Sequence, residues 1–274
     1  MSTAETPVYE WNDLAWPAME RRVFKLQTRI YRASRRGDVR TVHRLQRLLM
    51  VSWSARCLAV RRVSQDNRGK KTAGVDGVKN LAPDRRLHLA ASLRLTPTAQ
   101  PTRRVWIPKP GNPTERRGLG IPTLFDRARQ ALAKLLLEPE WEARFEPHSY
   151  GFRPGRSAHD AIEAIFLHVS RKPTYVFDAD IAKCFDRIDH TALLRKLHTT
   201  PPLRRAIKAW LTAGVMDGVD LTPTEQGTPQ GGVVSPLLAS IALHGLETAV
   251  KEAFPRTHKV NGKTIDPWQP VVIR

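Results

Sequence analysis

The chain has 274 residues, in which 45 Lys and Arg outnumber 26 Asp and Glu and give a formal net charge of +19 at pH 7. Its hydrophobic content of 41% and charged content of 26% are typical of globular proteins, which excludes a wholly disordered chain. The positive charge favours a polyanionic partner, and nucleic acid is a more common one than a membrane surface.

Cysteine content and hydropathy exclude further classes. The two cysteines, Cys57 and Cys184, lie far apart, so neither a disulfide framework nor a zinc module is expected. No apolar run approaches the roughly 20 residues that a membrane helix needs, and the acidic, polar N-terminus does not resemble a secretory signal. We therefore expect a soluble intracellular protein of one large or two small domains.

Two strongly basic helices are predicted between residues 21 and 62, which contain thirteen Lys and Arg and one acid, Asp38. Gly37 separates two sets of apolar residues with helical spacing. These sets are Val23, Leu26 and Ile30, then Val42, Leu45 and Leu49. Basic helix faces are often only solvated. This density of positive charge cannot be neutralised within the segment, however, so we favour a surface that binds RNA phosphates.

The next segment predicts a loop, a helix and a hairpin. A flexible basic loop is expected at 67–74, a turn-rich stretch at 74–78 and a helix at 83–93. An edge strand at 103–112 should end in a tight turn and pair with residues 117–122. Lysines and arginines flank this hairpin, which suits the binding of a triphosphate. The alternative is that they only keep the strand edge soluble.

Helices are predicted on both sides of a single strand. Asp126 should cap a helix that runs to about Leu137. Residues 157–160, Ser-Ala-His-Asp, form the pattern of a capping box at the start of another helix. The strand is expected at 174–181.

Three more helices are predicted after the strand. Asp189 should cap a short helix that ends before the two prolines at 201–202. A second helix is expected at 203–213, where Gly214 stops it. A long helix at 234–253 should follow the Gln-Gly-Gly turn at 230–232.

The strand at 174–181 carries the carboxylates with the clearest chemical meaning. Asp178 and Asp180 share one face of it, because side chains alternate along a strand. A buried strand rarely carries two carboxylates unless cations or basic groups meet them. Nucleotidyl transfer uses divalent cations that carboxylates hold. Each aspartate alone is equally compatible with a structural ion pair.

Two motifs, in this order along the chain, carry a resemblance to a known family. Residues 175–190 read Tyr-Val-Phe-Asp-Ala-Asp-Ile-Ala-Lys-Cys-Phe-Asp-Arg-Ile-Asp-His, and residues 226–238 read Gln-Gly-Thr-Pro-Gln-Gly-Gly-Val-Val-Ser-Pro-Leu-Leu. They resemble the metal-binding and nucleotide-binding motifs of group II intron-encoded reverse transcriptases. Further matches are Ile-Pro-Lys-Pro at 107–110, Arg-Gly-Leu-Gly-Ile-Pro at 117–122 and His-Ser-Tyr-Gly-Phe-Arg-Pro-Gly-Arg-Ser at 148–157. The resemblance covers residues 11–274.

The resemblance implies an α+β fold with a basic helical N-terminal region at 1–72, the fingers of a right-hand polymerase at 73–173 and an incomplete palm at 174–274. It implies an RNA-directed DNA polymerase that copies intron RNA during retrohoming, and a maturase that binds group II intron RNA to aid splicing. The implied partners are that RNA, an RNA template, a DNA primer and dNTPs, with no membrane. The implied location is a ribonucleoprotein in the bacterial cytoplasm.

The resemblance also implies roles for residues around the two motifs. Asp180 matches the catalytic, metal-binding aspartate, and the backbone carbonyl of Ile181 would join it on Mg²⁺. Phe185 matches the aromatic residue that excludes a 2′-hydroxyl, although core packing is the alternative. Gln230 and Gly231 match the nucleotide-binding turn, where a glycine lets a base pair approach the backbone.

Four basic side chains complete the site that the resemblance implies. Lys109 and Arg117 match ligands of the triphosphate. Arg153 and Arg156 lie beside aromatic residues, which suits contact with the template, and stacking within the protein is the alternative.

In the family, a Tyr-Ala-Asp-Asp turn follows the position of residues 271–274, Val-Val-Ile-Arg. We therefore expect residues 271–273 to form a strand beside 174–181, and we expect the chain as it stands not to polymerise alone. The alternative is a non-enzymatic remnant or subunit that binds intron RNA, and a companion chain or a homodimer is compatible with either. The intron-type N-terminal helices disfavour a retron-type or CRISPR-associated enzyme.

Overall fold

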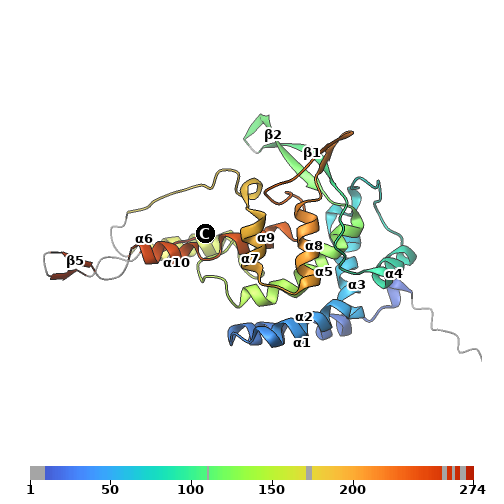
Figure 1. Ribbon diagram of the computed structural model, residues 1–274, viewed down its shortest axis with the longest axis horizontal. Coiled ribbons are helices and arrows are strands. Elements are labelled where there is room, and N and C mark those ends of the chain that lie inside the picture. The colour runs from blue at the N-terminus through green and yellow to red at the C-terminus, as the bar shows by residue number, and fades with distance from the viewer. Residues whose placement is uncertain (1–9, 110, 171–174, 255–257, 261–262, 266–269) are drawn as a thin grey trace, which may run out of the picture.

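The computed structural model describes residues 10–109, 111–170, 175–254, 258–260, 263–265 and 270–274 (Figure 1). Helices form most of this part of the chain, and a four-stranded sheet and a two-stranded hairpin complete it. The α+β class expected from the sequence is therefore confirmed. None of the described helices is long and apolar enough to cross a membrane.

The N-terminal region is a series of helical elements that pack on one long helix. They are η1 (Trp11–Asp13), α1 (Trp16–Arg35), α2 (Val39–Val51), α3 (Trp53–Arg61), the π-helical turn η2 (Arg62–Asp66) and η3 (Arg68–Lys71). Gly37 separates α1 from α2 as predicted, with a φ of +71° that costs a glycine little. Asp38 starts α2, because its carboxylate accepts a hydrogen bond from the N–H of Thr41 at 3.0 Å.

The long helix is α5 (Leu124–Glu142), which α1, α2 and α3 all contact. Its fully buried leucines are Leu124, Leu132, Leu136 and Leu137. The predicted cap, Asp126, is wrong, because the hydroxyl of Thr123 accepts the hydrogen bond from the N–H of Asp126 at 3.1 Å. Asp126 is instead buried in the first turn, where Arg129 binds its carboxylate at 2.8 Å. The helix also runs past the predicted end at Leu137.

The four-stranded sheet contains β1 (Thr102–Lys109), β2 (Asn112–Ile121), β3 (Val215–Asp217) and β4 (Asp220–Thr222), in the order β2-β1-β3-β4. The antiparallel β1–β2 hairpin confirms the predicted pairing. The prediction that its first strand is an edge is wrong. Thr102 and Arg103 pair in parallel with β3, because the chain returns after α8 and lays β3 against the start of β1.

Further short elements are α4 (Pro83–Ser92), α6 (Ala158–Val169), η4 (Cys184–Arg187), α7 (His190–Leu197), α8 (Pro201–Leu211) and the hairpin of β5 (His258–Val260) and β6 (Lys263–Ile265). Two of them, α6 and α7, begin at the caps predicted for them. Ser157 and Asp160 form the capping box of α6. Asp189 caps α7 by accepting a hydrogen bond from the N–H of Ala192 at 2.5 Å. Gly214 follows α8 with a φ of +80°.

The long helix predicted at 234–253 is two helices, α9 (Ser235–Leu243) and α10 (Leu246–Ala253). Gly245 lies between them with a φ of +98°. The buried carboxylate of Glu146 stabilises this break. It accepts hydrogen bonds from the N–H groups of Gly245 at 2.9 Å and Glu247 at 3.0 Å, which satisfies donors at the start of α10.

The strand predicted at 174–181 is absent from residues 175–181, and residue 174 lies outside the described residues. The side chains of Tyr175, Val176 and Phe177 are exposed. A strand needs hydrogen bonds from a neighbouring strand, and no described strand lies beside this segment.

The second predicted palm strand, at 271–273, is also absent. Instead the end of the chain joins the segment before α6. The N–H of Arg274 donates to the carbonyl of His148 at 2.9 Å, and its own carbonyl accepts from the N–H of Tyr150 at 2.6 Å. The guanidinium of Arg274 also lies 3.3 Å from the buried carboxylate of Glu146.

Candidate active site and nucleic-acid interface

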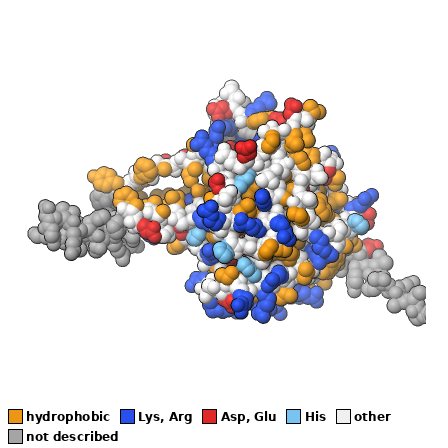
Figure 2. Space-filling view, in the orientation of Figure 1, with side chains coloured by type: hydrophobic (Ala, Val, Ile, Leu, Met, Phe, Trp, Pro, Cys, Tyr) orange, Lys and Arg blue, Asp and Glu red, His pale blue; other side chains and the backbone are white. Residues whose placement is uncertain are grey.

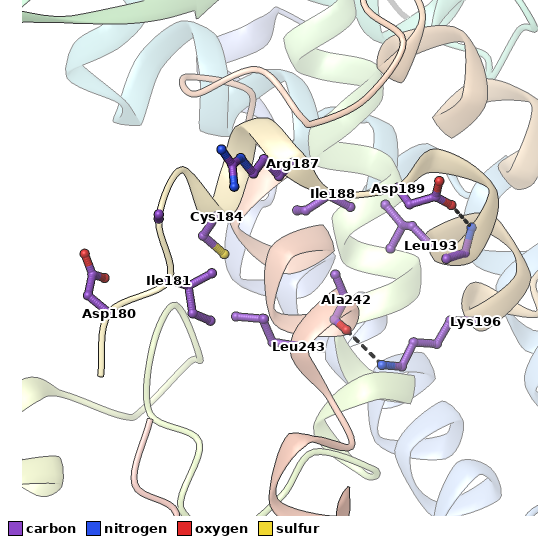
Figure 3. Close-up of a pocket in the computed structure, with 12 residues that line it drawn as sticks. Asp180, Ile181, Cys184, Arg187, Ile188, Asp189, Leu193, Lys196, Ala242 and Leu243 are labelled. Atoms are coloured by element: carbon purple, nitrogen blue, oxygen red, sulfur yellow. Dashed lines mark hydrogen bonds between the residues drawn. The ribbon is translucent and has the colours of Figure 1, made fainter. Parts of the chain in front are cut away.

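A cavity of about 630 Å³ lies where residues 180–184, η4, α7 and the end of α9 meet. In Figure 3, Asp180 lies at one edge of the cavity on an extended segment, and Lys196 lies at the opposite edge. Ile181, Cys184 and Leu243 are among the residues between them. The first predicted motif therefore lines a cavity rather than a packed core.

Some of the charged groups around this cavity already form hydrogen bonds within the protein, and others do not. The carboxylate of Asp189 is held by its capping bond to Ala192. The amine of Lys196 donates to the carbonyls of Ala242, at 2.9 Å, and His244. Burial lowers the pKa of Lys196, and the carboxylate of Glu146 opposes that shift. Asp180 is exposed at the rim.

Sequence reasoning did not select Lys196, although a signal for it exists. Asp189, Ala192, Leu193 and Lys196 all line the cavity. They follow the spacing i, i+3, i+4, i+7, which places residues on one helix face. If this spacing had been followed along the sequence from Asp189, it would have predicted that Lys196 lies at the same site.

Whether the cavity can hold a divalent cation depends on how many ligand atoms surround one point in it. Within the described residues, no group of three or more His, Cys, Asp or Glu could hold a metal ion. Asp180 and the carbonyl of Ile181 therefore form at most part of a site. Burial raises the pKa of the Cys184 thiol, which disfavours a thiolate ligand at that position.

The two predicted motifs lie directly against each other. The N–H of Gly227 donates to the carbonyl of Ile188, and the N–H of Thr228 donates to the carbonyl of Phe185, both at 2.8 Å. The ring of His190 bonds to the carbonyl of Gly227 at 2.6 Å. A Cβ on Gly227 would lie 2.7 Å from the carbonyl oxygen of Asp186, so this contact requires glycine.

The same loop also contacts the β1–β2 hairpin. The carbonyl of Gln230 accepts a hydrogen bond from the N–H of Gly120 at 2.7 Å. Gly231 has a φ of +124°, and a Cβ there would lie 2.8 Å from the carbonyl oxygen of Gly120. The close backbone approach expected of this turn is present, and its described partner is the hairpin. The side chain of Gln230 is half-buried.

Phe185 packs within the protein. Its ring is half-buried and meets that of Phe152 edge to face, with centroids 5.9 Å apart. It also contacts the hydrophobic core. These contacts account for part of its surface, and the role in sugar selection stays a prediction.

The predicted triphosphate ligands both lie on the hairpin. Arg117 on β2 pairs with Ile107 on β1, and Lys109 follows Ile107 by two residues, just past a register shift between Pro108 and Lys109. Both are exposed. Lys109 forms an ion pair with Glu115, and this hydrogen bond lowers the pKa of Glu115. Solvent screens an exposed pair of this kind and leaves it weak, so a triphosphate could displace it.

Arg153 and Arg156 have different environments. Arg153 is buried, donates to Glu142 at 2.8 Å and to the carbonyls of Glu146 and Ser149, and lies 5.3 Å from the ring of Phe145. These bonds identify it as a structural residue. Arg156 is exposed and lies 5.3 Å from the ring of Tyr150.

Comparison with known proteins gives consistent matches. A family model described as reverse transcriptase (RNA-dependent DNA polymerase) matches residues 107–265, and one described as the N-terminal domain of reverse transcriptase matches residues 11–93. The chain is 33% identical over 225 residues to "Protein YkfC" of Escherichia coli K12, which covers 77% of this chain and 58% of that protein.

Two other relatives carry more descriptive names. The chain is 34% identical over 207 residues to "Group II intron-encoded protein LtrA" of Lactococcus lactis subsp. cremoris, which covers 73% of this chain and 34% of that protein. It is 29% identical over 246 residues to "Maturase-like protein 1" of Euglena gracilis, and the match covers 86% of this chain and 52% of that protein. The chain therefore spans between 34% and 58% of the lengths of these three relatives.

Proposed function

This chain belongs to the reverse transcriptase family, and we propose that it acts in the RNA-directed DNA polymerase of a group II intron, with a maturase role in binding the intron RNA. The observation that supports this most is the contact of three motifs. The loop at 226–232 bonds both to the segment at 185–188 and to Gly120 of the hairpin. A candidate metal-binding aspartate, a nucleotide-binding turn and a triphosphate-binding hairpin therefore belong to one continuous region.

The hairpin is the proposed binding site of the triphosphate. Lys109 and Arg117 are both exposed on the paired strands β1 and β2, so a polyanion that binds the hairpin can reach them. Arg117 supplies a planar fork that suits phosphate oxygens, and Lys109 supplies a compact charge. Binding would exchange the weak pair of Lys109 with Glu115 for a stronger one with phosphate.

The loop at 226–232 is the proposed platform for the templating base pair. Backbone hydrogen bonds to Gly120 and Ile188 fix the loop, so the turn is preorganised in the absence of nucleic acid. Gln230 would hydrogen-bond at the pair, and Phe185 would close the space next to the sugar. Asp180 and the carbonyl of Ile181 would hold one side of a divalent cation, Mg²⁺, and the described residues contain no group of three or more His, Cys, Asp or Glu that could complete its coordination.

The basic helices α1 and α2 are the proposed surface for intron RNA. Figure 2 shows Lys and Arg side chains gathered along the lower edge of the molecule, where Figure 1 places these helices. We assign residues 1–72 to a basic helical N-terminal region, 73–173 to the fingers and 174–274 to part of the palm. The other proposed partners are an RNA template, a DNA primer and dNTPs.

Primer extension tests the proposal directly. The protein that carries this sequence is incubated with an RNA template, an annealed DNA primer, dNTPs and Mg²⁺, and its affinity for structured RNA is measured in parallel. We expect extension only when the rest of the palm is supplied, in the same chain or by a companion chain. In either case we expect RNA binding that weakens by orders of magnitude between low and moderate salt. RNA binding without extension when the palm is supplied would support the non-enzymatic alternative, and the loss of both would reject the proposal.

A further inference from the structure

A second cavity, of about 390 Å³, lies between α1 and α2, far along the chain from the proposed active site. Its lining residues are Arg29, Arg32, Arg36, Thr41, Arg44 and Leu45. Four of these six side chains are guanidinium groups. A cavity with this composition is built to receive negative charge.

The sequence creates the cavity through helical spacing and one turn. Arg29, Arg32 and Arg36 stand at i, i+3 and i+7 and so share one face of α1 and its end. Gly37 reverses the chain with a φ of +71°, and α2 then presents Thr41 and Arg44 from the facing side. Leu45 is buried and closes the floor of the cavity.

The four arginines are only partly compensated by negative charge within the chain. In the part of the chain that the structure describes, none of them forms an ion pair. The nearest acid along the chain is Asp38, whose carboxylate is engaged with Thr41 at 3.0 Å. Hydrogen bonding by Thr41 lowers the pKa of Asp38, and Arg36 and Arg44 lower it further. One engaged carboxylate cannot neutralise four cations.

The two walls of the cavity are fixed from behind by α5. On α1, the amide of Gln27 donates to the carbonyl of Leu135 at 3.0 Å, and the hydroxyl of Ser34 donates to the carbonyl of Glu140 at 2.8 Å. On α2, the buried amide of Gln46 donates to the carboxylate of Glu140 at 2.7 Å. The backbone that carries the arginines is therefore held in place without a ligand, which lowers the entropy cost of binding one.

We propose that this cavity is a discrete binding site for a phosphodiester group of RNA, distinct from the diffuse attraction of the other surface arginines. The proposal rests on the proposed function for its RNA partner. Its volume lies within the range of about 300–1,000 Å³ of ligand cavities, so it has room for a phosphate and part of the adjoining ribose. Guanidinium groups from two helices can bind one phosphate through paired hydrogen bonds.

The test compares two double variants that remove the same charge. Arg29→Gln with Arg44→Gln removes one lining arginine from each helix. Arg22→Gln with Arg47→Gln removes one exposed arginine from each helix outside the cavity. We expect the cavity variant to bind structured RNA about 10- to 100-fold more weakly than the wild type, because it loses charge-assisted hydrogen bonds. The control variant should lose clearly less. An equal loss in the two variants would overturn the discrete site.

A third variant separates hydrogen-bond geometry from charge. Arg29→Lys with Arg44→Lys keeps both charges and removes the forked donors. A discrete phosphate site predicts that this variant also binds RNA more weakly than the control variant. Affinity equal to that of the wild type would reduce the site to simple charge attraction and would overturn the proposal.

Inorganic phosphate distinguishes a free anion from RNA as the ligand. In the absence of RNA, phosphate should raise the melting temperature of the wild type above that in chloride at equal ionic strength, and the Arg29→Gln, Arg44→Gln variant should lack this gain. Stabilisation by phosphate with no difference in RNA affinity between the two double variants would make the cavity a free-anion site. Failure of the wild type to bind RNA at all would reject the proposed function, while the phosphate measurement would still report on the cavity.

Discussion

Asp178 and Asp180 stand two residues apart on the same exposed segment, but Asp180 lines the 630 Å³ cavity and Asp178 does not. If Asp180 holds a cation at the reacting phosphate, its loss removes several kcal/mol of transition-state stabilisation. With the rest of the palm and the thumb supplied, in the same chain or by a companion chain, we expect Asp180→Ala to abolish primer extension on an RNA template and to leave RNA affinity nearly unchanged.

Asp178→Ala is the matched control for that experiment. It removes an equal charge from the same segment and should retain most of the extension rate. Extension by the Asp180→Ala protein at the rate of the wild type would show that the metal-binding residue has been misassigned.

Phe185 gives the second prediction at this scale. Phe185→Ala should retain DNA synthesis and admit ribonucleotides, since it removes a steric barrier and no ligand. Its packing partner Phe152 provides the control, because Phe152→Ala breaks the same edge-to-face contact from the other side. The assay is primer extension with dNTPs or rNTPs. If both variants admit rNTPs equally, packing alone explains Phe185.

The structural role of a single residue could be predicted from the sequence where it depends on neighbours close along the chain. The capping box of Ser157 and Asp160 and the cap by Asp189 depend on neighbours three residues away, and both are confirmed. The cap by Asp126 was wrong because Thr123 competes for the same N–H, and because Arg129 takes the carboxylate. The burial of Arg153 depends on Glu142 and on carbonyls that only the fold brings together.

At the scale of elements, the turn at Gly231 combines positive φ with a close backbone contact. Gly231→Ala should destabilise the protein by about 1–3 kcal/mol, because a Cβ is strained at this φ and meets the carbonyl oxygen of Gly120. Urea unfolding measures the change. Gly151→Ala is the control, since nothing lies within 4 Å of its Cβ, and should be nearly neutral. Equal stability of the two variants would contradict the close contact between the loop and the hairpin.

The junction of α9 and α10 predicts a dependence of stability on pH. Burial lowers the pKa of His244, and Glu146 opposes this shift. A histidine whose pKa is lowered by folding stabilises the fold when neutral. Its contribution is therefore complete above its ordinary pKa of 6.5 and is lost as the pH falls below that value toward the folded-state pKa.

Substitution of His244 isolates this contribution. Urea unfolding of His244→Gln should show a smaller loss of stability between about pH 7.5 and pH 5.5 than the wild type does. His159→Gln, which changes an exposed histidine on α6, should keep the dependence of the wild type. An unaltered pH dependence in His244→Gln would show that another group titrates in this range.

Periodicity predicted helices better than it predicted strands. The first two basic helices, α4, α7 and α8 were expected within a few residues, because their apolar spacing or breaking residues lie within each segment, whereas the break between α2 and α3 was not predicted. The strand at 174–181 was not found in residues 175–181, because pairing is non-local and no described strand adjoins it. The break at Gly245 depends on Glu146, about a hundred residues earlier in the chain, and so escaped a local reading.

At the scale of the whole molecule, the sequence predicted which motifs carry chemistry but not how they meet. The loop at 226–232 and the segment at 185–188 were expected to act together, and the structure adds the hydrogen bonds that join them. The contact with Gly120 and the cavity of four arginines depend on how helices and hairpin pack, which no single motif encodes.

The hydrogen bond between Gly120 and Gln230 also has a mechanical consequence. It fastens the base of the β1–β2 hairpin to the loop at 226–232, whereas the tip lies beyond the register shift between Pro108 and Lys109. Regular strand pairing ends at this shift, so only the tip of the hairpin, Lys109 included, lies outside the regular ladder. We therefore expect Lys109 to adjust its position toward a ligand while the paired base of the hairpin and the loop keep theirs.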